Sequence, residues 1–460
     1  MKRTALAAIG ALFLAGAPAV RAADTAAPAL KLPQAQVERL LAAYAMIKQN
    51  YVGDTDDQTL FDGALSGMLA ALDAHSSYLD KDAMRDVGRE NSGEYVGIGI
   101  EVEGNRDRLR VVSATEGSPA ERAGIRAGDT IVSVDGAPVA GMANDEVARR
   151  MHGAPGTVVA IGVARRDKIE TLHVTRAALH NDTVHVKMAA PALAWIRVSE
   201  FGGATAADLA AALKKLDAPR GLILDLRNDP GGLVATGVAV AGAFLQPGTV
   251  LFSARGREPG ANATVTVDAR YYRAQGQPDV LAGLPAWTRT VPLTVLVNGA
   301  SASAAELVTG ALQDQHRATV IGTRTFGKGS IQSVIPLDQD SGIKFTVARY
   351  FTPNGREIQA RGVTPDIVVA PSVTSSFAAD DDLLLREADL AHHLAATQPP
   401  DATVNAQREP LESTRTFGTR DDKALQAAVA VLTPPADKRA PLLSGLLRKW
   451  SGAIAATGAP

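Results

Sequence analysis

Short, wholly apolar runs alternate with helical patterns between residues 180 and 370, and this alternation constrains the fold of the chain. The apolar runs lie at 194–198, 221–226 and 293–297, and helical patterns lie near 205–216, 233–244 and 303–314. Strands that are apolar throughout, rather than at every second residue, are typical of a buried sheet. The sequence therefore predicts an α/β layer built on such a sheet, interrupted by a polar, glycine-rich stretch at 252–290.

Residues 93–178 show a different pattern, in which β-type runs are separated by glycine-rich turns. The runs lie at 95–102, 109–114, 130–134 and 157–165, and the helical patterns lie at 119–124 and 144–151. A stretch of about 85 residues is an ordinary size for a small domain. We expect a compact, mostly antiparallel module here.

Both flanks of the chain carry helical periodicity. Apolar residues recur at helical spacing in 34–50 and 59–72, and again in 381–396 and 421–432. The segment Asp73–Leu79 breaks the period, and we interpret it as part of a small helical unit rather than as a functional site.

The first 22 residues have the composition of a secretory signal peptide. Lys2 and Arg3 precede an apolar run at 5–17, and small residues surround Val20 and Ala22. The run is shorter than the roughly 20 apolar residues that span a bilayer. The sequence therefore predicts an exported, soluble mature protein, with an uncleaved anchor as the alternative.

The composition narrows the chemistry that the chain can perform. The 460 residues contain no cysteine, which excludes disulfides, thiolate zinc sites, iron–sulfur clusters and cysteine nucleophiles. The histidines form no HExxH pair, and the adjacent His392 and His393 are more simply a solvated pair. A net charge of −2 leaves no basic excess for a nucleic-acid backbone. We expect neither a metal nor nucleic acid as a partner.

A serine-rich segment, Ser301–Leu307, follows the apolar run 293–297 and opens a helical pattern. A serine at a helix start lies among unpaired backbone N–H groups, which can stabilise an oxyanion. Ser303 and Glu306 also have the spacing of a capping box, whose role is only to start a helix. Taken alone, the segment favours the cap.

A lysine between two glycines, Lys328, precedes an alternating run at 330–337 that predicts a strand. Lys328 and Gln332 are four residues apart, so on a strand they would project to the same face. A lysine serves as a general base only when neutral, which requires desolvation to lower its pKa. The amide oxygen of Gln332 could then orient the amine. Most lysines between glycines are surface residues, so this signal is weak by itself.

The apolar run 221–226 ends in a polar turn that contains Gly231 and Gly232. Glycine lets backbone N–H groups approach a ligand closely, which suits the other half of an oxyanion hole. The alternative is an ordinary strand-to-helix turn.

Taken together and in this order, the three segments resemble the carboxy-terminal processing peptidases, also called tail-specific proteases. The resemblance extends through 350–359 and 362–366 and includes 51–52 and 73–78, so it covers most of the mature chain. It implies that Ser303 is the nucleophile, Lys328 the general base and Gln332 the residue that orients the lysine. It also implies an oxyanion hole made by the backbone N–H groups of Ala304, Gly231 and Gly232.

The sequence departs from the family pattern at a few positions beside these residues. Asp229 stands where asparagine is frequent, Ala300 where glycine is frequent, Ala305 where serine is frequent and Ala74 where proline is usual. None of these changes alters a proposed catalytic side chain.

The module at 93–178 resembles a PDZ domain. Its carboxylate-binding loop matches Gly97, Ile98, Gly99 and Ile100, and residues 117–131 match the helix–turn–strand of protease-associated PDZ domains. In such domains a strand edge adds a peptide strand while free N–H groups hold the terminal carboxylate. The resemblance thus implies capture of apolar C-terminal tails.

The expected fold class is a multidomain α/β protein: a protease core with a mixed sheet, an inserted antiparallel PDZ domain with two helices, and helical segments at both ends. The expected boundaries are a signal peptide at 1–22, a helical segment at 30–91, the PDZ domain at 92–178, the core at 179–372 and a helical extension at 373–460.

The resemblance implies a periplasmic serine endopeptidase that needs no cofactor and cleaves protein or peptide substrates with apolar C-termini. A homodimer or higher oligomer and an activating adaptor are left open as partners. A non-catalytic periplasmic PDZ adaptor or chaperone is the alternative from another class. Penicillin-binding chemistry is disfavoured because it requires a Ser-x-x-Lys tetrad, which is absent around Ser303.

Overall fold

The computed structural model describes a large part of the chain, in several stretches. These are residues 33–92, 94–105, 108–114, 118–126, 129–142, 147, 150–165, 168–180, 183–371, 386–398 and 416–433. The described residues divide into two compact units, a larger one drawn from Met1–Met84, Val184–Phe201 and Thr205–Pro460, and a smaller one drawn from Arg85–Thr183 and Gly202–Ala204. The predicted signal peptide lies outside the described residues. Among the helices that are described, none is both long and apolar enough to span a membrane.

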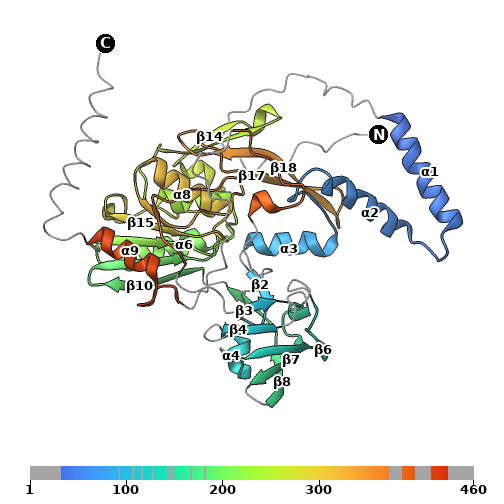
Figure 1. Cartoon of the computed structure of the whole chain (residues 1–460), viewed down its shortest axis with the longest axis horizontal. Coiled ribbons are helices and arrows are strands. Elements are labelled where there is room, and N and C mark those ends of the chain that lie inside the picture. The colour runs from blue at the N-terminus through green and yellow to red at the C-terminus, as the bar shows by residue number, and fades with distance from the viewer. Residues whose placement is uncertain are drawn as a thin grey trace, which may run out of the picture. The chain divides into compact units, whose positions relative to one another are not determined.

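The larger unit contains a six-stranded sheet with the order β10-β11-β12-β15-β16-β19 (Figure 1). The strands are β10 (Val184–Ala190), β11 (Leu193–Val198), β12 (Gly221–Asp225), β15 (Leu293–Val297), β16 (Thr319–Gly322) and β19 (Ile367–Val368). β10 is antiparallel to β11, whereas every other neighbouring pair is parallel. The predicted α/β layer with a mixed sheet is therefore confirmed.

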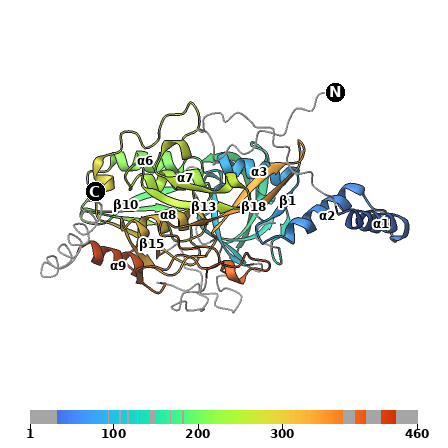
Figure 2. The ribbon, with the colours of Figure 1, turned by 90° about the horizontal axis from the view of Figure 1, so that it is seen from above.

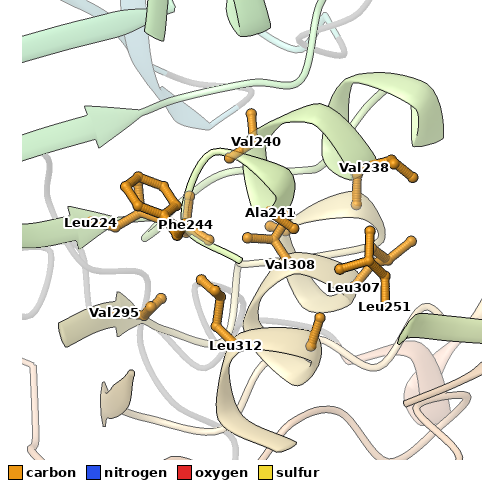
Figure 3. Close-up of a cluster of buried hydrophobic side chains, with 14 of the residues drawn as sticks. Leu224, Val238, Val240, Ala241, Phe244, Leu251, Val295, Leu307, Val308 and Leu312 are labelled. Atoms are coloured by element: carbon orange, nitrogen blue, oxygen red, sulfur yellow. The ribbon is translucent and has the colours of Figure 1, made fainter. Parts of the chain in front are cut away.

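Helices cover both faces of this sheet. They are α6 (Thr205–Lys215), α7 (Val234–Gly242), α8 (Ala304–Asp314) and α9 (Lys423–Leu432). Alternate side chains of a strand point to opposite faces, so Leu224 and Val295 pack with α7 and α8 (Figure 3), whereas Ile223 and Leu296 pack with Leu425 of α9. Figure 2 accordingly shows α6 and α7 on one side of the sheet and α9 on the other. Burial on both faces explains why the central strands are apolar throughout.

A second, antiparallel sheet of five strands belongs to the same unit. Its strands are β1 (Ser77–Leu79), β13 (Val250–Gly256), β14 (Ala263–Thr266), β17 (Ser330–Pro336) and β18 (Gly342–Phe351). The stretch at 252–290 thus contributes strands and three short 3-10 turns, η1 (Pro259–Ala261), η2 (Ala269–Tyr271) and η3 (Ala286–Arg289). Strand β1 pairs with Gly342–Lys344 of β18, beside which it lies in Figure 2.

The helices predicted at the N-terminal end of the chain are confirmed, whereas of those predicted at the C-terminal end only one is confirmed. The predicted N-terminal helices are α1 (Gln34–Asn50) and α2 (Asp57–Ala70), and the predicted helix at 421–432 is α9. The prediction at 381–396 is wrong over its described part, which starts at residue 386, because only a single 3-10 turn forms there, η5 (Glu387–Asp389). Most of the expected extension at 373–460 lies outside the described residues.

The smaller unit is mostly antiparallel, as predicted. One sheet has the order β3-β4-β5-β7-β8 with β6 on β5, and a separate ribbon pairs β2 with β9. Figure 1 labels most of these strands. The elements are α3 (Lys81–Ser92, which enters this unit), β2 (Glu94–Gly97), β3 (Ile100–Asn105), β4 (Arg108–Ala114), α4 (Pro119–Ala123), β5 (Thr130–Val134), β6 (Ala137–Pro138), β7 (Val158–Arg165), β8 (Lys168–Thr175) and β9 (Ala177–His180). Val111, Ile131 and Val159 are buried in its own apolar core. The predicted helix at 144–151 lies partly outside the described residues.

Candidate active site

Three loops meet at one edge of the six-stranded sheet. Strands β12, β15 and β16 are adjacent and parallel, so the loops that follow them leave from the same edge. The loop after β12 carries Gly231 and Gly232, the loop after β15 leads to Ser303, and the loop after β16 carries Lys328. Parallel pairing therefore gathers three segments, the first and last of which lie about a hundred residues apart in the sequence.

The backbones of Ser303 and Lys328 are joined through two buried side chains. Oε2 of Glu306 accepts the N–H of Ser303 at 2.9 Å and the N–H of Lys328 at 2.8 Å. The hydroxyl of Tyr350, on β18, lies 2.8 Å from the Ser303 carbonyl oxygen and also contacts the Lys328 carbonyl oxygen. The serine loop and the lysine loop are thus held side by side at the level of the main chain.

Glu306 lies in the first turn of α8 and is fully buried. Its other oxygen accepts the N–H of Gly327 at 2.7 Å and the hydroxyl of Thr325. Burial raises the pKa of Glu306 to about 7, against the effect of these hydrogen bonds, which favour the carboxylate. By accepting the N–H of Ser303, Glu306 supplies its half of the capping box that the sequence predicts. The cap and the candidate site therefore use the same carboxyl group.

Lys328 has the electrostatic surroundings that a general base requires. Burial lowers the pKa of Lys328, and the positive charge of Lys344 lowers it further. Glu387, Glu306 and Asp73 oppose this shift. Within the described residues the ammonium of Lys328 has no hydrogen-bond partner, so nothing there stabilises its protonated form through a direct contact.

Ser303 adopts a backbone conformation that is rare for a residue with a side chain, with φ of 53° and ψ of −114°. Such positions cost on the order of 1–3 kcal/mol and are concentrated at functional sites. Gly231, with φ of 95°, lies directly against this turn. A Cβ added there would come within 2.8 Å of both the Ser303 Cβ and the Ala304 nitrogen. Only glycine therefore fits beside the strained serine.

Of the three N–H groups predicted to form the oxyanion hole, one already donates a hydrogen bond within the protein and two have no acceptor among the described residues. The N–H of Gly231 donates to Oδ1 of Asp229 at 2.8 Å. Within the part of the chain that the structure describes, the N–H groups of Gly232 and Ala304 have no acceptor. Ala300, which precedes the helix where the family pattern has glycine, does not require positive φ, and its N–H donates to Asn298 at 3.2 Å.

Gln332 lies on β17, but the strand argument that linked it to Lys328 is wrong. The strand begins at Ser330, so Lys328 lies in the preceding loop and does not share a strand face with Gln332. The amide of Gln332 donates to the hydroxyls of Ser330 at 2.9 Å and Thr346 at 3.2 Å. No hydrogen bond between Gln332 and Lys328 is present among the described residues.

The segment Asp73–Leu79, which we interpreted as unrelated to a site, contacts the lysine loop through a chain of side chains. His75 Nε2 lies 2.7 Å from Glu387, whose other oxygen accepts from Gln359 at 2.6 Å. Gln359 in turn accepts the N–H of Gly329 at 3.0 Å. Asp73, His75 and Ser76 directly follow the predicted helix at 59–72. This cluster of polar residues is the only sequence signal for their position near the lysine loop.

The predicted carboxylate-binding loop of the smaller unit lies between β2 and β3. Gly99 has φ of 79°, and the Ile98 carbonyl accepts the N–H of Ala120 at 2.8 Å. Among the described residues the N–H groups of Ile98 and Gly99 have no acceptor, and β3 is an edge strand of its sheet. A free strand edge beside free N–H groups is the arrangement that strand addition requires.

Comparison with known proteins gives three family matches and several relatives. Residues 192–369 match peptidase family S41, residues 110–165 match a PDZ domain, and residues 17–83 match the N-terminal domain of the activating protease CtpB. Among the described residues no cluster of side chains could hold a metal ion.

A carboxy-terminal-processing protease of Bartonella bacilliformis is 36% identical over 80% of this chain and 82% of that protein. A probable CtpA-like serine protease of Staphylococcus aureus is 33% identical over 74% of this chain and 66% of that protein. A solved photosystem II D1 C-terminal processing protease is 30% identical, with 74% of this chain and 88% of that chain covered and a TM-score of 0.47. The chain therefore belongs to the carboxy-terminal processing proteases of peptidase family S41, which are serine-type peptidases.

Proposed function

We propose that this chain is an exported endopeptidase that captures the C-terminal tail of a protein substrate and cleaves the substrate with Ser303, Lys328 and Gln332. The proposal rests on one observation. The N–H groups of Ser303 and Lys328 both donate to Glu306, and their carbonyl oxygens both contact the Tyr350 hydroxyl. A lysine with a lowered pKa, fixed next to a strained serine at a helix start, is suited to general-base chemistry.

In the proposed mechanism, neutral Lys328 takes the hydroxyl proton of Ser303 as the serine oxygen attacks the peptide carbonyl. The developing oxyanion accepts hydrogen bonds from the free N–H groups of Gly232 and Ala304, at the positive end of α8. Lys328 then donates its proton to the leaving amine, and water hydrolyses the acyl-enzyme. The amide oxygen of Gln332 accepts no hydrogen bond among the described residues, while Nε2 donates to Ser330 and Thr346, and in the proposed mechanism this oxygen accepts an amine hydrogen of Lys328.

Four purified variants test the catalytic assignment. Ser303→Ala and Lys328→Met should abolish cleavage of an unfolded protein with an apolar C-terminus, because one lacks the nucleophile and the other the base. Ser333→Ala on β17 and Lys81→Met on the surface serve as controls that retain activity. A serine-directed fluorophosphonate probe should label Ser303 in the wild type. Undiminished turnover in either catalytic variant would refute the assignment, and absence of labelling and cleavage would favour a tail-binding adaptor.

The smaller unit is proposed to select substrates by their free C-terminal carboxylate. The support is the pair of free N–H groups at Ile98 and Gly99 next to the edge strand β3. A peptide with a C-terminal amide should bind more weakly and be cleaved more slowly than the same peptide with a free acid. Equal affinity and equal rate for the two peptides would rule out carboxylate capture.

Export to the periplasm and assembly with other chains are further parts of the proposal. The N-terminal composition supports export, and the match of residues 17–83 to the N-terminal domain of an activating protease supports a partner that switches activity on. Exposed apolar side chains on the first two helices, including Leu41 and Phe61, support a homodimer or higher oligomer. Cell fractionation and light scattering test these points, and a cytoplasmic or monomeric protein would contradict them.

A further inference from the structure

Asp229 is a buried carboxyl group at the glycine turn beside the candidate nucleophile. Its side chain is fully inaccessible to solvent. Oδ1 accepts the N–H of Gly231 at 2.8 Å, whereas Oδ2 has no hydrogen-bond partner among the described residues. The main-chain carbonyl of Asp229 accepts the N–H of Ala302, next to Ser303, at 2.9 Å. Asp229 thus connects the glycine turn to the serine loop.

The peptide group that Asp229 holds borders the site directly. A Cβ built on Gly231 would lie 2.8 Å from both the Cβ of Ser303 and the nitrogen of Ala304. The Gly231 N–H points to the Asp229 carboxyl group, while the N–H groups of Gly232 and Ala304 have no acceptor within the described part of the chain. The carboxyl group therefore binds the N–H of Gly231, whereas the N–H groups of Gly232 and Ala304 are left to bind another acceptor.

We propose that Asp229, in its uncharged acid form, is a positioning residue that binds the N–H of Gly231 and so reserves the N–H groups of Gly232 and Ala304 for the oxyanion. The inference rests on the proposed catalytic role of Ser303. It assigns Gly231 a structural role in the turn rather than the role of a donor to the substrate.

Two physical arguments favour the uncharged form. An ionised carboxylate in a dry site would repel the negative charge that develops on the substrate oxygen nearby. An isolated carboxylate charge is also far more costly to bury than the neutral acid, even though the acid's O–H at Oδ2 has no acceptor among the described residues. Burial raises the pKa of Asp229 well above its usual range. The Glu200 charge adds to this shift, and the Gly231 hydrogen bond and the Arg197 charge oppose it.

Asp229→Asn is the informative substitution, because the amide keeps the shape and the acceptor oxygen but stays neutral at every pH. In the wild type we expect kcat to rise as Lys328 loses its proton and to fall as Asp229 ionises. The Asn variant should keep the rise and lose the fall. Asp229→Ala removes the acceptor and should lower kcat about ten- to a hundredfold with little change in KM. Asp217→Asn, on the surface, serves as the matched control.

Thermal unfolding provides a readout that does not depend on activity. Because folding raises the pKa of Asp229, the wild type loses stability as pH rises through the folded-state value, whereas the Asn variant does not. The Tm of the Asn variant minus that of the wild type should therefore increase with pH. Should Asp229→Ala fail to fold, the two Asn measurements alone decide the proposal.

The outcomes separate this inference from the proposed function. A fall of kcat with pH that persists in Asp229→Asn, a Tm difference that is flat with pH, or wild-type kcat in Asp229→Ala would each overturn the role of Asp229. If Ser303→Ala abolishes cleavage while the Asp229 variants behave as wild type, only the inference fails. If Ser303→Ala retains full turnover, the proposed function fails and the inference fails with it.

Discussion

The main chains of Ser303 and Lys328 have two partners in common: the N–H groups of the two residues donate to one oxygen of Glu306, and their carbonyl groups both contact the Tyr350 hydroxyl. The spacing between the two residues is therefore set by buried groups outside the reacting pair. Truncating the Ser303 or Lys328 side chain should leave the main-chain geometry intact, whereas changing Glu306 or Tyr350 should disturb it.

Glu306→Gln should lower both stability and turnover. The amide has a single acceptor oxygen for donors that now share two, and its NH₂ group would face other N–H groups. Leaving buried donors unpaired costs about 1–3 kcal/mol of unfolding free energy, measured by urea denaturation. Glu258→Gln, on an exposed residue, is the control.

The effect of Glu306→Gln should also depend on pH. The folded-state pKa of about 7 lies above the ordinary value of 4.5, so the wild type is most stabilised by this group below pH 4.5 and loses that contribution as pH rises through 7. The destabilisation caused by the substitution should therefore be larger at pH 5 than at pH 8. A destabilisation that is equal at pH 5 and pH 8 would show that Glu306 is ionised throughout this range.

Tyr350→Phe should reduce kcat while leaving the apolar packing of the ring in place. The substitution removes one hydroxyl and leaves the carbonyl groups of Ser303 and Lys328 without it, at a cost of about 1–2 kcal/mol. We expect a fall in kcat of about tenfold and little change in KM, measured by steady-state kinetics. Tyr271→Phe, whose hydroxyl makes only a 3.3 Å contact, should behave as wild type. Unchanged kcat in Tyr350→Phe would mean that Glu306 alone aligns the two loops.

Charge changes around Lys328 should move the acid limb of the pH–rate profile in opposite directions. The Lys344 charge lowers the pKa of Lys328, so Lys344→Gln should move the limb to higher pH. The Glu387 charge raises that pKa, so Glu387→Gln should move the limb to lower pH. Lys81→Gln, on a surface ion pair, should leave it in place. Shifts of the same sign in the first two variants would argue against Lys328 as the group that titrates.

Asp422→Asn should destabilise the attachment of α9 to the sheet without touching the candidate site. Asp422 pairs with the buried guanidinium of Arg227 at 2.7 Å, and Asp225 binds the same group. Arg227 keeps its pairing with Asp225, but the amide cannot accept all the hydrogen bonds that the Asp422 carboxylate accepts from Arg227, Gly418 and Leu425. Leaving a buried donor unpaired costs about 1–3 kcal/mol. The adjacent, exposed Asp421→Asn should have little effect on denaturant unfolding. Activity well below the Tm should persist, and an equal loss in both variants would contradict this account.

Local patterns were sufficient for most elements of the fold. The strands β11, β12 and β15 and helices α6, α7 and α8 begin and end within a few residues of the positions that periodicity predicts. The pattern failed at 381–396, where the predicted helix is a 3-10 turn over the described part. There the chain is held by contacts to distant residues, such as the His75–Glu387 pair, which spacing along the sequence cannot reveal.

The order of three motifs predicts which residues form the candidate site, but it does not predict which of these residues contact one another. Lys328 and Gln332 were linked by an assumed common strand, although the lysine lies in a loop. Gly231 was counted as a donor to the substrate, whereas in the structure it donates to Asp229. Glu306 was interpreted as a helix cap, although it also binds the lysine loop.

Local residue patterns specify where strands and helices form, because these elements depend on the polarity and backbone preference of residues a few positions apart. Which loops meet depends on tertiary contacts, because three parallel strands place their carboxyl ends at one edge of the sheet. The tertiary structure also decides that Lys328 is desolvated and that Glu306 and Asp229 are buried, since burial depends on segments that only folding brings together.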